Sequence, residues 1–304
     1  MRRYTVYGDL AHRDAVALST TLAAKGLDFE FVEETASLSY ALAARTGRDS
    51  GPYLRTPEGF VLAELHAMLD WIERMHPEPA LLPTTPIRRT VARLIEDWLE
   101  LWLPFWPRRS WATLERVGAH LQATGFLLGP RSSRPDWLLA AWLESDVLVH
   151  DHAREHLSRT SPRLVLFGNE LLESTAASSP ASGSSRLPVG SAPSAVSGDD
   201  VIPISLLPVL EEIAADYHDF LVENHRACKD GLDHVLLDLG LGRRAMPVRP
   251  VCEERRAEIG RELSLWTRAE RRDLRQVLEP VGLWHAMTLP PVLAELDPAD
   301  PRRL

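Results

Sequence analysis

The chain has 304 residues, which is enough to bury a sizeable core in one or two domains. Hydrophobic residues make up 45% and charged residues 25%, a composition typical of a soluble globular protein. The 43 acidic and 34 basic residues give a net charge of -9, which argues against a nucleic-acid partner because binding phosphates needs a basic surface.

The distribution of apolar residues disfavours two further classes, membrane-spanning proteins and secreted proteins. No run approaches the ~18 apolar residues of a membrane-spanning helix, so no membrane partner is expected. No apolar leader follows Met1, because a strand pattern begins at once, and we therefore expect a cytoplasmic protein. The two cysteines, Cys228 and Cys252, are expected to be free and buried, since no CxxC or metal-type spacing surrounds them.

The first third of the chain alternates between strand and helix patterns. Residues 4–7 are rich in β-formers and are followed by Gly-Asp, which indicates a strand and a turn. Apolar residues at steps of three and four predict an amphipathic helix over 13–25. The run 29–32 alternates and predicts a second strand, which the crossover places parallel to the first.

A hairpin pattern follows. Pro52 opens a short strand, where its missing N–H does not break the ladder, and the Gly51–Pro52 bond is a place where a cis peptide costs little. Residues 56–59 form a turn, and a second apolar strand runs up to Glu64. A helix over 65–75 completes the order strand, helix, strand, hairpin, helix. This is a thioredoxin-like α/β layout, and we assign it to a first domain of residues 1–83.

The chain changes character after a proline-rich linker near residue 83. We predict an all-α second domain over 84–304, with helices at 88–103, 204–220 and 251–278 and no strand. Residues 174–198 are rich in Ser, Ala, Gly and Pro and are expected to form a mobile surface segment. The charged run 253–275 is expected to be solvent-exposed, with spaced ion pairs.

A helix-start signal lies at Ser133 and Asp136. Ser and an acid three residues later are a variant of the capping box, in which both side chains satisfy N–H groups of the first helical turn. Pro135 lies in that first turn, where its missing donor does no harm.

Together, the Gly51–Pro52 loop, Glu64 and the Ser133 box resemble the glutathione transferase superfamily, and in particular its bacterial members. The resemblance implies that the Gly51–Pro52 loop holds the cysteinyl backbone of glutathione and that Glu64 holds its γ-glutamyl end. Leu65 stands where the family has a serine that helps to bind this end. The resemblance also implies a homodimer.

The family's catalytic group lies where the first strand meets the first helix, and it donates a hydrogen bond that favours the thiolate of glutathione. The run Tyr7–Ala15 resembles the start of a bacterial branch, but His12 replaces the family's serine and Ala15 its cysteine. The candidate donors are therefore Tyr7 and His12. His12 or Arg13 could also stabilise the thiolate by charge, with the dipole of the helix N-terminus added. The alternatives are a core strand position for Tyr7 and an exposed helix-entry position for His12. Glu64 is alternatively a helix N-terminal acid favoured by the macrodipole.

An aromatic group on the first long helix of the second domain and its exit includes Trp102 and Trp106. The resemblance implies that this helix faces the second substrate, and an apolar electrophile needs such a wall. The alternative for these tryptophans is core packing. On a helix, Asp146 and His150 share one face and His152 and His156 another, so no face collects three ligands and no metal site is expected.

Two functional hypotheses follow from the sequence. In the first, the protein binds glutathione as a co-substrate and adds its thiol to a small apolar electrophile. In the second, the same fold is catalytically inactive and serves for ligand binding or protein assembly. The kept Glu64 favours the first, and Leu65 and Ala15 favour the second.

Overall fold

The computed structural model describes residues 3–105, 110–176, 200–238 and 242–292. Two compact units are present: Met1–Pro83 with Leu121–Gly198, and Thr84–His120 with Asp199–Leu304. Residues 84–304 therefore contribute to both units, and a domain boundary after residue 83 stays a prediction. The segment 174–198, predicted to be mobile, lies almost wholly outside the described residues, and α8 ends at Ala176.

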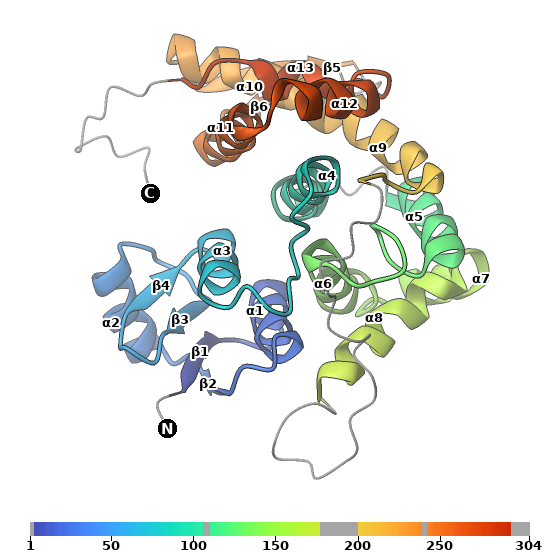
Figure 1. The fold of residues 1–304 in the computed structure, drawn as a ribbon. Helices are drawn as coiled ribbons and strands as arrows, with labels where there is room; N and C mark the ends of the chain where they lie inside the picture. Colours follow the sequence, from blue (N-terminus) through green and yellow to red (C-terminus); the bar gives the residue numbers. More distant parts are fainter. Residues whose placement is uncertain (1–2, 106–109, 177–199, 239–241, 293–304) are drawn as a thin grey trace. The chain divides into compact units, whose positions relative to one another are not determined.

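The first unit begins with a four-stranded mixed sheet of order β2-β1-β3-β4 (Figure 1). β1 is parallel to β2 and antiparallel to β3, and β3 is antiparallel to β4. This strand order confirms the predicted thioredoxin-like layout. The strands are Tyr4–Gly8 (β1), Phe29–Glu33 (β2), Tyr53–Arg55 (β3) and Val61–Ala63 (β4). The helices between them are Arg13–Ala24 (α1), Ala36–Thr46 (α2) and Leu65–Met75 (α3).

The core of this sheet is apolar because α1 and α3 each bury one face. Leu18 and Leu22 of α1 and Met68 and Ile72 of α3 have no exposed side-chain surface. Burying a side chain of this size contributes roughly 1.5–3 kcal/mol relative to leaving it in water. α1 and α3 are thereby fixed on the sheet, which positions the loops at its edge.

The first unit also contains three helices from the later part of the chain. They are Arg134–Trp142 (α6), Asp151–Thr160 (α7) and Pro162–Ala176 (α8). The capping box predicted at the start of α6 is confirmed, with the Asp136 carboxylate accepting from the backbone N–H and the hydroxyl of Ser133 at 2.8 and 2.7 Å. Asp136 also accepts from the N–H of Leu127 at 2.8 Å, so this buried carboxylate anchors the preceding loop as well as the helix.

The second unit is mainly helical. Its first helix, α4, is followed by a π-helical turn at Trp98–Trp102. α5 begins in this unit, but its residues from Leu121 onwards belong to the first unit. The helices are Pro86–Asp97 (α4), Ser110–Thr124 (α5), Leu207–Ile213 (α9), Asp219–Asp230 (α10), Pro250–Leu265 (α11), Arg268–Leu278 (α12) and Trp284–Thr288 (α13).

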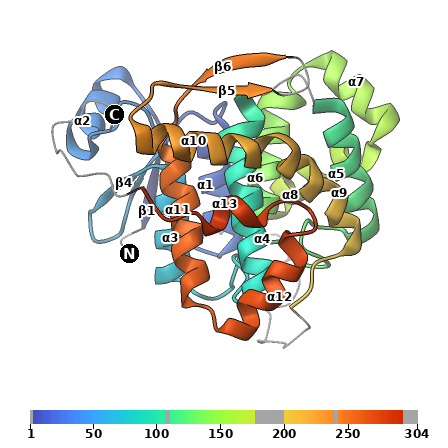
Figure 2. The same ribbon diagram turned by 90° about the horizontal axis from the view of Figure 1, so that it is seen from above.

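A hairpin in this unit corrects the expectation of no strand after residue 84. His234–Asp238 (β5) pairs antiparallel with Arg243–Pro247 (β6), and Figure 2 shows the pair as two arrows next to α10. The hairpin forms because alternate residues Val235 and Leu237 are buried, as the period of two in a strand requires. The remainder of the chain is thus largely helical with one small sheet.

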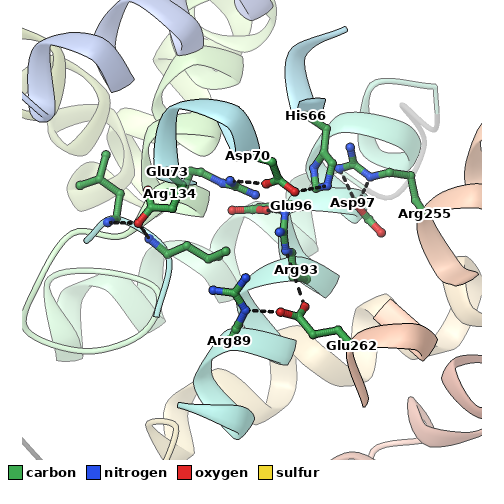
Figure 3. Close-up of polar contacts among 12 residues, drawn as sticks. His66, Asp70, Glu73, Arg89, Arg93, Glu96, Asp97, Arg134, Arg255 and Glu262 are labelled. Atoms are coloured by element: carbon green, nitrogen blue, oxygen red, sulfur yellow. Dashed lines mark hydrogen bonds and ion pairs between the residues drawn. The ribbon is translucent and has the colours of Figure 1, made fainter. Parts of the chain in front are cut away.

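The predicted exposure of the charged run 253–275 is wrong for its first turn. Glu253, Arg255 and Arg256 are at most 6% exposed. Arg255 contacts the Asp97 carboxylate at 2.6 Å, and Arg89 and Arg93 of α4 pair with Glu262 of α11 (Figure 3). Arg93 and Arg255 are buried because α11 packs on α4 and carboxylates across that contact neutralise their charges, whereas Arg89 is partly exposed.

Candidate functional site

The carboxyl ends of the parallel strands β1 and β2 meet the start of α1 and the loop before β3. A β-carbon placed on Gly8 would lie 3.1 Å from the Cβ of Ala15 and 3.4 Å from the Cβ of Pro52. The backbone N–H of Glu34, after β2, donates to the Gly8 carbonyl at 3.0 Å. The structure therefore brings together, at one edge of the sheet, the segments that the sequence singled out separately.

The loop before β3 is shaped by Gly51 and Pro52. Their peptide bond is cis, Pro52 is buried and Gly51 is half-buried. A β-carbon on Gly51 would lie 2.7 Å from Oε2 of Glu34 and 3.2 Å from the ring of Tyr53. A side chain at position 51 would therefore displace the Glu34 carboxylate, which lies beside the backbone of this loop.

The ring of Tyr53 lies against Gly51. Its hydroxyl donates to the Arg48 carbonyl at 2.8 Å, and its side chain is fully buried. Burial, and then the carboxylates of Glu34 and Asp49, raise the pKa of the Tyr53 hydroxyl. Tyr53 therefore stays neutral and supports the Gly51–Pro52 loop by packing against it.

The two candidate donors occupy different settings. Tyr7 is half-buried in β1, in register with Val32 of β2 and Tyr53 of β3. His12 is the N-cap of α1, with a side chain 53% exposed, and its Nδ1 accepts from the N–H of Asp14 at 3.4 Å. Because Nδ1 accepts, a neutral His12 carries its proton on Nε2 and can donate only from there.

The positive charge of Arg13 is already paired with two carboxylates. Its guanidinium contacts the Asp14 carboxylate at 3.3 Å and donates to the Asp146 carboxylate at 2.8 Å. Asp146 belongs to the π-helical turn Leu143–Val147 that extends α6. Arg13 thus ties the first turn of α1 to the helices of its own unit.

Glu64 and Leu65 lie at the junction between β4 and α3. Glu64 has a φ of 73° and is the one non-glycine residue with positive φ in the described part of the chain. It occupies the N-cap position of α3 without a side-chain capping hydrogen bond, which weakens its interpretation as a simple helix-start acid. Leu65 is 3% exposed and packs in the core, so it supplies no polar group.

A polar chain that the sequence analysis missed holds the first turns of α3. His66 pairs with Asp70 at 3.5 Å, and Asp70 accepts from Arg134 of α6 at 2.7 Å (Figure 3). The Arg134 side chain has no exposed surface, and its backbone N–H donates to the Leu81 carbonyl at 2.7 Å. The i,i+4 spacing of His66 and Asp70 was the available signal, but nothing in the sequence paired them with Arg134.

The predicted electrophile wall is described only in part. Trp102 is 1% exposed, and its ring lies 5.6 Å from that of Tyr217 and 4.9 Å from that of Phe220. The side chain is therefore a core element of the second unit. Trp106 lies outside the described residues.

Two further expectations concern metals and membranes. His150 and His152 stack at 5.7 Å, and within the described residues no group of three or more His, Cys, Asp or Glu side chains is placed to hold a metal ion. Among the helices that the structure describes, none combines the length and the apolar character needed to cross a bilayer.

Comparisons with known proteins give likenesses of structure alone. No protein-family model and no curated protein matches the chain. A glutathione S-transferase from Rhodospirillum rubrum F11 is 18% identical with a TM-score of 0.47, covering 55% of this chain and 87% of its own. FzlA from C. crescentus has the same identity and TM-score, covering 56% and 87%.

A glutathione S-transferase from Methylobacterium radiotolerans JCM 2831, in complex with glutathione sulfonate, is 22% identical with a TM-score of 0.45, covering 56% of this chain and 90% of its own. Identities of 18–22% indicate a likeness of fold alone. Because the TM-scores are only 0.45–0.47, the activities of these proteins are not carried over to this chain. The fold class rests on the strand order and helices of the chain itself.

Proposed function

We propose that the protein is a glutathione transferase-like enzyme that binds glutathione at the Gly51–Pro52 edge of the sheet and activates its thiol towards a small apolar electrophile. Gly51 and Pro52 hold the cysteinyl backbone, and Glu64 takes the ammonium of the γ-glutamyl group. Tyr7 or His12 donates a hydrogen bond to the sulfur. The close approach of Gly8, Ala15 and Pro52 supports this assignment, because it brings the end of β1 and the start of α1 next to the Gly51–Pro52 loop.

The observation that carries the proposal is the backbone of Glu64. A non-glycine residue at positive φ costs about 1–3 kcal/mol, and such conformations cluster where a ligand is clamped. Glu64 adopts one at the turn from β4 into α3, at the position that the sequence assigned to the ligand. A glycine would relieve the cost, so retaining a glutamate here favours a role for its carboxylate.

Glutathione fits part of this edge. Gly51 is half-buried and has no side chain to cover its backbone, as close approach of a peptide needs, whereas Gly8 is buried against Ala15 and Pro52. Because Leu65 has no hydroxyl, the γ-glutamyl carboxylate would depend on the first N–H groups of α3, which form an anion-binding helix end.

Calorimetric titration with glutathione tests the proposal. We expect saturable binding by the native protein and a loss of at least about tenfold in Glu64→Ala, the equivalent of one 1.4 kcal/mol ion contact. Glu64→Gly is expected to lose binding equally while raising the free energy of unfolding by about 1 kcal/mol. Glu33→Ala, at an exposed position at the end of β2, is the control. No binding up to millimolar glutathione would refute the assignment.

The two donor candidates are separable once binding is established. If Tyr7 donates to the sulfur, Tyr7→Phe raises the pKa of the bound thiol and His12→Ala leaves it unchanged; if His12 donates, the pattern is reversed. Thiolate absorbance of bound glutathione, followed against pH, measures this pKa. An unchanged value in both variants would remove both residues from the mechanism.

Further parts of the proposal concern the second substrate and the setting. The electrophile would contact the aromatic group predicted at Trp102 and Trp106, although burial of Trp102 favours a packing role for that side chain. We also propose a homodimer in the cytoplasm with no nucleic-acid or membrane partner and no metal.

A further inference from the structure

Glu34 places a carboxylate directly at the proposed peptide-binding loop. Its backbone is fixed by the hydrogen bond from its N–H to the Gly8 carbonyl. Its Oε2 lies 2.7 Å from the position that a β-carbon of Gly51 would occupy. A peptide paired with the backbone of Gly51 would therefore run beside a carboxylate, whichever side chain activates its thiol.

The Glu34 carboxylate has no close counter-ion in the described part of the chain. The Glu34 side chain makes no ion pair there, while the guanidinium of Arg13, at the start of α1, is committed to Asp14 and Asp146. Asp49 adds a second carboxylate close enough to act on Tyr53. The loop thus presents negative charge to a ligand. Glutathione itself carries two carboxylates, which this charge repels.

This inference rests on the proposed function, in which Glu64 holds the γ-glutamyl end of the peptide. Glu34 follows β2 and Glu64 follows β4, on opposite sides of the sheet, so the glycyl end is the one directed towards Glu34. We infer that Glu34 sets specificity at this site, favouring thiol peptides whose glycyl end is an amide or an amine instead of a carboxylate. A like charge within a few ångströms is a repulsive element that lowers affinity for the wrong ligand. An amine in the same place forms a charge-assisted hydrogen bond with Glu34. The preferred ligand is a neutral or cationic derivative of a γ-glutamyl-cysteinyl thiol.

Three probes that differ only at the glycyl end test this inference. They are glutathione, its glycyl ethyl ester and its glycyl aminoethyl amide, titrated calorimetrically into the full-length chain. We expect the affinity to rise in that order, with the amine at least about tenfold tighter than glutathione at low salt and the difference shrinking as salt is added.

Glu34→Gln is expected to remove the preference, leaving the three affinities within about twofold of one another. Glu33→Gln, at the exposed neighbouring position, should retain it. Binding of all three probes with equal affinity by the native protein would overturn the inference while leaving the proposed function standing, as would a preference unchanged in Glu34→Gln. No binding of any probe would overturn both.

Discussion

Lys25→Met is expected to lower the free energy of unfolding by about 3–5 kcal/mol, the cost of removing one partner of a buried ion pair. The Lys25 side chain has no exposed surface. Its ammonium donates to the carbonyls of His76 and Pro79 at 2.7 and 2.8 Å and lies 2.9 Å from the Glu73 carboxylate. Methionine therefore leaves two carbonyls without their donor and the Glu73 carboxylate without its counter-ion.

The loss should reach beyond the lysine itself. Glu73 also accepts from the N–H groups of Leu81 and Leu82, so Lys25 and Glu73 together fix the end of α3 and the segment that follows it. Urea unfolding of the variant measures the change. The chain's other lysine, Lys229, is exposed at the end of α10, and Lys229→Met should stay within about 0.5 kcal/mol. Equal effects in the two variants would contradict the assignment of a buried pair.

The N-terminal elements could be predicted from the sequence because their signals are local. The helix at 65–75 was predicted to the residue, since Met68, Leu69 and Ile72 repeat at helical spacing and prolines follow it. The strand at 29–32 was one residue short. Local periodicity suffices where one face of an element is apolar throughout.

The later part was harder to predict because tertiary packing decides it. The single helix predicted over 251–278 is two helices, separated at Trp266 and Thr267 by a capping box between Thr267 and Glu270. That signal was present in the sequence but hidden in a charged run. The β5–β6 hairpin carries exposed arginines on β6, so its pattern lacked the alternation that marks a strand.

The residues of the candidate site divide in the same way, into those with a local sequence signal and those positioned by tertiary packing. Gly51, Pro52 and Glu64 could be proposed as site residues because the resemblance to a known family rests on a short, local pattern of loop and strand. Glu34 could not, because its carboxylate reaches Gly51 only through the pairing of β1 with β2 and β3. The Asp70–Arg134 contact joins residues 64 positions apart, a distance at which a single sequence carries no pairing signal.

Asp136 is expected to make the stability of the native fold depend on pH. Burial raises the pKa of its carboxyl group from 3.8 to about 6, against the opposing effect of its hydrogen bonds from Leu127 and Ser133. The folded state therefore holds this proton more tightly than the unfolded chain. Its stabilising contribution is complete below about pH 4 and is lost as the pH rises through 6, amounting to about 3 kcal/mol at 1.36 kcal/mol per pH unit.

Asp136→Asn isolates this contribution because asparagine cannot titrate. The substitution has a fixed cost, since its amide N–H cannot accept from Ser133, but that cost is the same at every pH. Urea unfolding at each pH gives the free energy of unfolding of the native protein and of the variant. Between pH 4 and pH 7 the native protein should lose about 3 kcal/mol of this free energy relative to the variant. The exposed Asp233→Asn should track the native protein. Parallel profiles for Asp136→Asn and the native protein would mean that the hydrogen bonds from Ser133 and Leu127 outweigh burial and keep Asp136 ionised in the folded state.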